Sequence, residues 1–419
     1  MRRLEGVFLG IGFVFLLSEV FGGMLRYYLA SLGVAPLIYL PKALLAVGLA
    51  GAVLLSLVNK RVSLFFLLVL ALAVEFSLVG YAFVGNSLQV TFGLWVILPF
   101  FYGILILPSI LRVWSRLRPY LLLLWGSAVI GVIINAFHDW PWVGFAYSLG
   151  GVEVEGSRAW FTAGLGLFRI PGFSRASFEA ASQILLLGLS LTFLMRMRWR
   201  VLLWLVSGVA IVLTTSKTPL GIWLFLSLMF VLGRLVPLRF LRLLPVFFAL
   251  AGIGLPLSSV YVSYDPKADS AVERFLVASF ADRLGWMWPM SLQMVVEHGS
   301  WLFGRGIGGI GSPQQYFEPL LYSPADNLAV YLFGLGGVVG LLLLAAYGLI
   351  AFLIPLRTLQ DRFFFLLTLA VLLEGWTVNV MESSFFGMVF GLTLRYWWEM
   401  SEKRAVSPKE GARSMIWQK

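Results

Sequence analysis

Long apolar stretches, separated by short polar and basic segments, repeat along the whole chain of 419 residues. Twelve of them approach or exceed the ~20 residues that a helix needs to cross the hydrocarbon core of a bilayer. We therefore predict an all-α integral membrane protein with about twelve transmembrane helices in one polytopic domain, 1–419. The predicted spans are 6–22, 36–58, 62–84, 88–110, 119–137, 178–195, 201–216, 218–233, 244–262, 326–352, 363–381 and 384–398.

The composition excludes several classes of protein. Sixty per cent of the residues are hydrophobic and only 12% are charged, whereas a soluble domain carries about 25% charged residues. The chain has no cysteine and two histidines, so we expect neither disulfides nor a transition-metal site. We expect no cofactor. The net charge of +11 does not indicate a nucleic-acid partner, because the basic residues lie in short clusters between the spans.

These basic clusters predict the orientation in the membrane. Clusters follow every second span, and one side of the predicted bilayer holds 20 of the 31 Lys and Arg, against nine on the other side and two, Lys42 and Arg395, inside spans. Cytoplasmic loops carry the excess of Lys and Arg. We therefore expect both termini, including a tail at 399–419, to be cytoplasmic.

Two predicted external segments are long, 138–177 and 263–325. Long loops without a fold of their own are commonly functional. The second is predicted to contain short surface helices, one of them starting at Ser270 with Glu273 completing a capping box. Its apolar face fits either the outer membrane surface or a lid packed on the spans. The residues of that face are Val272, Phe275, Leu276, Phe280, Leu284 and Met287.

External cations are the candidate binding residues, because the predicted topology disfavours basic residues on that side. Arg169 and Arg175 precede the outward-facing start of the sixth span, and Lys217 lies in a tight hairpin before Pro219, with Thr218 as the expected N-cap. Helix N-termini favour anions, so a phosphate site is one interpretation. The alternatives are ion pairs with nearby carboxylates for the arginines and contact with lipid headgroups for all three.

Three further charged residues belong to the late external segment and the start of the tenth span. Arg283 lies on the predicted surface helix, where an ion pair with Asp282 or Glu297 is the alternative to anion binding. Arg305 lies in a glycine-rich run that would let backbone approach a ligand. Asp326 is either a general base or simply the N-cap of the tenth span.

Five ionisable residues fall within or at the ends of predicted spans. Such groups are functional candidates or tie helices together in pairs, and the sequence assigns none of them. They are Glu19, Lys42, Glu75, Glu374 and Glu382.

These features resemble the bacterial O-antigen ligase and O-antigen polymerase superfamily. The resemblance covers the twelve-span plan, the large external loop between spans nine and ten, and several local motifs. The motifs are Arg169-Ile170-Pro171-Gly172-Phe173, Thr215-Ser216-Lys217-Thr218, Arg283 with Trp286, Leu302-Phe303-Gly304-Arg305-Gly306-Ile307-Gly308-Gly309, and Asp326-Asn327 followed by the stretch from Gly334 to Gly340.

The resemblance implies transfer of a glycan from a polyprenyl diphosphate carrier at the outer face of the bacterial inner membrane, by an inverting and metal-independent displacement. It implies diphosphate binding by Arg169, Lys217, Arg283 and Arg305, with Lys217 in place of the usual Arg. Ligases of the family carry His-Asn where this chain has Asp326-Asn327. We therefore expect a polymerase that acts on carrier-linked repeat units, with a chain-length regulator as a further candidate partner.

Two alternatives remain open. One is an O-antigen ligase that transfers the glycan to lipid A–core, and the other is a twelve-span transporter. A transporter usually has two related halves, whereas this chain has few external charges among its first four spans and its largest loop late. That asymmetry favours the enzyme.

Overall fold

The computed structural model describes residues 2–58, 63–149, 152–232, 235–261 and 270–406, and these ranges are mostly helical. The helices are α1 (Arg2–Val20), α2 (Gly22–Ser31), α3 (Leu40–Val58), α4 (Leu64–Val84), α5 (Ser87–Val96), α6 (Leu98–Arg112), α7 (Arg118–Asn135), α8 (Ser177–Leu194), α9 (Met197–Leu213), α10 (Lys217–Leu232), α11 (Leu238–Leu241), α12 (Leu244–Ser259), α13 (Ala271–Asp282), α14 (Trp288–His298), α15 (Ser312–Phe317), α16 (Leu328–Leu353), α17 (Leu359–Glu374) and α18 (Ser384–Val406).

The apolar helices confirm a multi-pass membrane protein. Six helical segments are long and apolar enough to cross a bilayer, or up to eight if each of two bent pairs is one span. The predicted number of twelve is therefore not confirmed, since several predicted spans are shorter helices, such as the apolar segment Lys217–Val231. The six segments are Ala35–Val58, Leu64–Val84, Trp114–Asn135, Ser177–Leu194, Leu238–Ser259 and Leu328–Leu353.

The bundle has a buried centre and an apolar exterior. Helices α8 and α16 are mostly enclosed by other helices, whereas α3 and α4 turn most of their apolar side chains outward. Exposing that much apolar surface to water would be costly, at roughly 25 cal/mol per Å². The exterior of α3 and α4 therefore suits contact with lipid.

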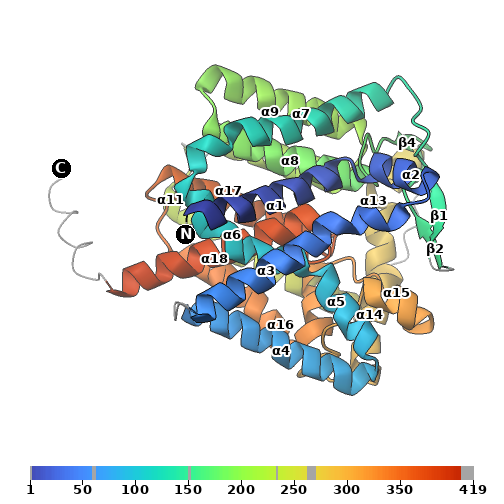
Figure 1. Cartoon of the computed structure of the whole chain (residues 1–419), viewed down its shortest axis with the longest axis vertical. Helices are drawn as coiled ribbons and strands as arrows, with labels where there is room; N and C mark the ends of the chain where they lie inside the picture. Colours follow the sequence, from blue (N-terminus) through green and yellow to red (C-terminus); the bar gives the residue numbers. More distant parts are fainter. Residues whose placement is uncertain (1, 59–62, 150–151, 233–234, 262–269, 407–419) are drawn as a thin grey trace.

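The start of α1 and the end of α18 lie at one end of the bundle (Figure 1). The opposite end carries α2, α13 and two short antiparallel pairs, β1 (Ala146–Leu149) with β2 (Val152–Glu155) and β3 (Trp160–Phe161) with β4 (Phe168–Arg169). We call this the hairpin end.

Two predicted spans are broken. The first ends at Val20, where the chain bends by 81° into α2, and the fourth is divided into α5 and α6 with a bend of 43°. Pro99 lies in the first turn of α6, and a proline clashes with the carbonyl four residues earlier, which kinks or breaks a helix at that point. The Lys42 ammonium donates to the Val96 carbonyl at 3.3 Å. This carbonyl belongs to the last residue of α5, and carbonyls at the end of a helix lack partners within it.

Helix ends also differ from the predictions near the C-terminus. The span predicted at 363–381 ends at Glu374, where the Gly375 carbonyl accepts the Leu328 N–H (2.7 Å) and so joins the end of α17 to the start of α16. Helix α18 continues to Val406, beyond the predicted start of the tail at 399. The rest of the tail, 407–419, lies outside the described residues, as does the start of the predicted external loop, 263–269.

The predicted surface helix is present as α13. Its capping box is confirmed, because the Glu273 N–H donates to the Ser270 hydroxyl and the Ser270 N–H donates to the Glu273 carboxylate, both at 3.1 Å. On its predicted apolar face, Phe275, Phe280, Leu284 and Met287 are partly buried and Val272 is exposed. A π-helical turn, Arg283–Met287, follows α13 and leads directly into α14.

Candidate active site

A cavity of about 320 Å³ lies where β3, β4, the start of α10, the last turn of α13 and the end of α17 meet. Four of the predicted site residues line it, although they come from distant parts of the chain. Those four are Arg169, Lys217, Arg283 and Asp326. The other lining residues are Arg158, Trp160, Phe161, Thr162, Ala163, Phe178, Thr215, Ser216, Thr218, Pro219, Ser279, Glu374, Thr377 and Val378.

Arg169 ends β4 and is paired in register with Trp160 of β3. Its guanidinium lies 5.5 Å from the Trp160 ring and donates to the Ser216 hydroxyl at 3.5 Å. Its Nε is buried without a hydrogen-bond partner, and no ion pair to a carboxylate involves this side chain among the described residues. Burial, followed by the charge of Arg283, lowers the pKa of Arg169. An unpaired cation with an unused donor is suited to an anionic ligand.

Lys217 is the first residue of α10, and its ammonium donates to the carbonyl of Phe275 in α13. The same ammonium lies 4.7 Å from the centre of the Phe275 ring. The predicted N-cap at Thr218 is wrong, because the helix starts one residue earlier and the Thr218 hydroxyl instead bonds that of Thr377 at 2.7 Å. Lys217 therefore ties the surface helix to the wall of the cavity.

Arg283 is placed by the π-helical turn that follows α13. Its guanidinium donates to the Asp326 carboxylate at 2.9 Å and to the Ser279 carbonyl at 2.7 Å. Its Nε is buried without a partner in the described part of the protein. The expected alternative, an ion pair with Asp282 or Glu297, is wrong because Asp326 takes that place. π-Helical turns occur frequently at functional sites.

Asp326 is not the N-cap of α16. Asn327 is that cap, because its side-chain oxygen accepts the N–H groups of Ala329 (2.7 Å) and Val330 (3.1 Å). The interpretation of Asp326 as a cap is therefore wrong, and its carboxylate is available to the cavity. Burial raises the pKa of Asp326, and the adjacent Arg283 lowers it in part.

Two further charged residues of this cavity were given no role from the sequence. Glu374 is only 1% exposed; its Oε1 accepts from the Ser182 hydroxyl at 3.5 Å, and its Oε2 is buried without a partner among the described residues. The sequence signal for Glu374 was its position as a charged residue inside a predicted span. Arg158 is ion-paired with Glu155 at 2.9 Å, and its guanidinium lies 4.7 Å from the Trp160 ring. No sequence motif distinguished it.

Two predicted diphosphate residues do not line the cavity. Arg175 donates to the backbone carbonyl of Glu155 at 3.2 Å. Arg305 is 2% exposed and ion-paired with Glu318 at 3.0 Å, and it also donates to the carbonyls of His298 and Gly309. With these donors satisfied inside the protein, Arg305 stabilises the fold, and we correct its predicted role in ligand binding.

The glycine-rich run around Arg305 likewise approaches protein rather than ligand. Gly306 has a φ of +76°, and a Cβ there would lie 2.0 Å from the backbone nitrogen of Gly80 in α4. Gly304, with a φ of +73°, lies against α16, since a Cβ there would lie 2.6 Å from the carbonyl oxygen of Gly334. These glycines allow the loop to pack between α4 and α16.

The arrangement defines a membrane protein with a cation-rich cavity and one accessible carboxylate. Over the described ranges, no group of three or more His, Cys, Asp or Glu side chains could hold a metal ion. No family model, curated protein or solved structure matches the chain. The cavity could bind a phosphate-bearing group through its cations while Asp326 accepts a proton.

Proposed function

We propose that the protein is a membrane glycosyltransferase, a polysaccharide polymerase of the O-antigen type that uses polyprenyl diphosphate-linked glycans. The observation that carries this proposal is that Arg169, Lys217, Arg283 and Asp326 line one cavity. A glycosyl transfer without a metal needs cations to neutralise the leaving diphosphate and a base to take the proton of the acceptor hydroxyl. The cavity contains both the cations and a carboxylate that could act as the base.

We further propose twelve crossings of the bacterial inner membrane, with both termini cytoplasmic and the cavity on the outer face. Two features support this topology. The first described residues of α1 and the last of α18 lie at the same end of the bundle, as an even number of crossings requires (Figure 1). Cations of the cavity lie among the minority of basic residues on the other side.

The proposed reaction is an inverting displacement at the anomeric carbon of the glycan on its carrier. A hydroxyl oxygen of the acceptor forms the new C–O bond while the bond to the diphosphate breaks with its electron pair. The hydroxyl proton passes to Asp326, and Arg169, Lys217 and Arg283 neutralise the charge on the departing diphosphate. Preorganised cations stabilise such developing charge without reorganising during the step.

The ion pair between Arg283 and Asp326 has a role in this scheme. At 2.9 Å it favours the ionised carboxylate, which must be free of its proton before it can act as a base. When a diphosphate arrives, the guanidinium can turn its unused Nε–H towards it while keeping contact with Asp326. One arginine would then couple the leaving group to the base.

The test is a reconstituted reaction. Purified protein is incubated with a carrier-linked repeat unit in the presence of a chelator, and the products are separated by size. A ladder of oligomers supports a polymerase. Transfer only when lipid A–core is supplied would instead assign a ligase, and no transfer to either acceptor by folded protein would refute the glycosyltransferase proposal. Arg305 variants do not serve as controls here, since that residue stabilises the fold.

A further inference from the structure

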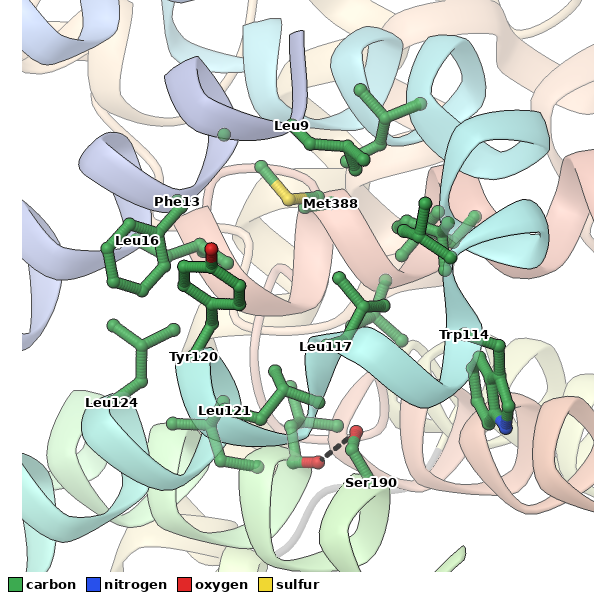
Figure 2. A pocket seen from close by; sticks show the side chains of 18 of the residues that line it. Leu9, Phe13, Leu16, Trp114, Leu117, Tyr120, Leu121, Leu124, Ser190 and Met388 are labelled. Atoms are coloured by element: carbon green, nitrogen blue, oxygen red, sulfur yellow. Dashed lines mark hydrogen bonds between the residues drawn. The ribbon is translucent and has the colours of Figure 1, made fainter. Parts of the chain in front are cut away.

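A second cavity, of about 400 Å³, lies between α1, α6, α7, α8, α17 and α18, apart from the site described above. Its walls are almost entirely apolar, as Figure 2 shows for Leu9, Leu117 and Met388. The Ser190 hydroxyl also faces it, but that hydroxyl already donates to the Leu186 carbonyl at 2.7 Å. The wall thus offers few groups that could hold a polar ligand.

One side of the cavity is formed by α1 and α7. Gly6 and Gly10 of α1 line it and are exposed, and a Cβ added to either would meet no atom within 4 Å. Phe13 of α1 and Tyr120 of α7 complete this side, with their rings 5.3 Å apart and edge to face. A flexible apolar chain in the membrane could therefore enter past the two glycines.

The rim of the cavity carries a free cation. Arg116 belongs to the turn Trp114–Leu117, which joins α6 to α7, and its side chain is exposed and makes no ion pair among the described residues. Its neighbour Arg112 is different, because it is paired with Glu5 at 2.5 Å. A basic group beside an apolar crevice between membrane helices is suited to an anionic lipid headgroup.

We propose that this cavity binds one acyl chain of an anionic phospholipid, whose headgroup phosphate contacts Arg116. A methylene group is about as large as a water molecule, which occupies roughly 30 Å³, so 400 Å³ holds on the order of a dozen methylenes. That is most of one acyl chain. An empty apolar cavity of this size would forfeit packing on every wall, which a lipid tail restores.

The first experiment fills the cavity from within. Gly10→Leu adds a side chain at a position where a Cβ would meet no atom within 4 Å, so the helix should still fold. The matched control is Gly51→Leu on α3, where a Cβ also meets nothing within 4 Å but where the residue does not line this cavity. The probe is phosphatidylglycerol with a photoreactive diazirine in one acyl chain, reconstituted with the full chain in vesicles.

Crosslinks in the wild-type protein should concentrate on cavity-lining peptides of α1, α7 and α8. Gly10→Leu should reduce them about tenfold, the change expected from displacing about two buried methylenes, and Gly51→Leu should leave them unchanged. Crosslinks spread evenly over the outward-facing α4, or equal yields in wild type and Gly10→Leu, would overturn the proposal.

The second experiment identifies the headgroup and the source of the chain. Unlabelled phosphatidylglycerol should displace the probe better than phosphatidylcholine with the same tails, and Arg116→Gln should remove that preference. Arg239→Gln, an exposed arginine on α11, is the control and should retain it. Displacement by a polyprenyl phosphate at lower concentration than by phosphatidylglycerol would assign the cavity to an isoprenoid and so overturn the phospholipid proposal.

Discussion

Replacing Asp326 by asparagine is the sharpest test of the proposed chemistry. The substitution changes one oxygen to an amide nitrogen and removes the negative charge, while the size and shape of the side chain are kept. The helix cap is untouched, because Asn327 supplies it. Contact with Arg283 also survives, since the remaining amide oxygen can still accept from the guanidinium.

The expected loss of stability is small. The side chain of Asp326 is 34% exposed and that of Arg283 15%, so the ion pair is partly screened by solvent and contributes no more than about 1 kcal/mol. Burial raises the pKa of Asp326, so the charged form is less favourable in the folded protein than in the unfolded chain. A neutral isostere avoids that cost, so the melting temperature at neutral pH should stay near that of the wild type.

The expected loss of activity is large. Removing a general base typically lowers the rate by about 10²–10⁴-fold, and even the lower figure corresponds to about 2.7 kcal/mol in the activation free energy. The cations of the cavity remain in place, so binding of the diphosphate carrier should change little. The substitution should therefore lower kcat while leaving KM almost unchanged.

The assay compares initial rates of oligomer formation by wild type and variant, together with thermal unfolding of both. Asp282→Asn is the matched control, because this exposed carboxylate directly precedes Arg283 and does not line the cavity. It should retain wild-type turnover. Near-normal oligomer ladders from folded Asp326→Asn would refute the role of Asp326 as base, and Glu374, the other carboxyl of the cavity, would become the candidate.

Four further predictions follow from the contacts of the charged residues and from the proposed topology. If ionised Asp326 is required, kcat/KM should fall as pH decreases through a pKa above the ordinary value of about 4, because burial raises that pKa; a pH–rate profile measures it. Arg169→Ala should lower kcat by about 10²–10³-fold, as for loss of one preorganised charge contact, with an unchanged melting temperature. Arg305→Ala should instead cost about 3–5 kcal/mol of stability, because it leaves the partner of a buried ion pair unpaired, and thermal unfolding distinguishes the two. In the cysteine-free chain, a cysteine at Leu320, which is 99% exposed, should react with an impermeant maleimide from outside, whereas one at Leu235, 77% exposed, should react only after the membrane is opened; labelling of Leu235 from outside would refute the proposed topology.

The sequence predicted the membrane class and much of the cavity for a physical reason. Runs of apolar residues and the distribution of basic residues are properties of local sequence, and the bilayer acts on both directly. Cations on the predicted external side, where the topology disfavours them, were therefore recognisable as exceptions. Three of them, Arg169, Lys217 and Arg283, line one cavity. Their chemical roles remain proposals.

Residues whose roles depend on tertiary packing could not be assigned in the same way. Arg305, like Arg169, is a cation on the predicted external side, yet it is buried against Glu318, a partner thirteen residues away that no local pattern identifies. Glu374 was recognised only as a charge inside a span, because its approach to the cavity depends on where α17 ends. The break in the first predicted span was missed because an apolar run does not reveal a bend. The break in the fourth lies at Pro99, a residue that the sequence shows and that favours a helix start.

Asp326 and Asn327 illustrate the limit most clearly, because both residues are good helix caps and they are adjacent. Backbone geometry decides between them. Ala325 has a φ of +46° and is fully buried, a conformation that costs on the order of 1 kcal/mol for a residue with a Cβ. Ala325 directly precedes these two residues. The Asn327 side chain accepts a hydrogen bond from the first turn of α16, and the Asp326 carboxylate accepts one from Arg283. Such strain persists only where the surroundings over-determine it, and it clusters at functional sites. The protein thus retains backbone strain next to the carboxylate that the proposed reaction needs. A residue that served only as a helix cap would not require this strain.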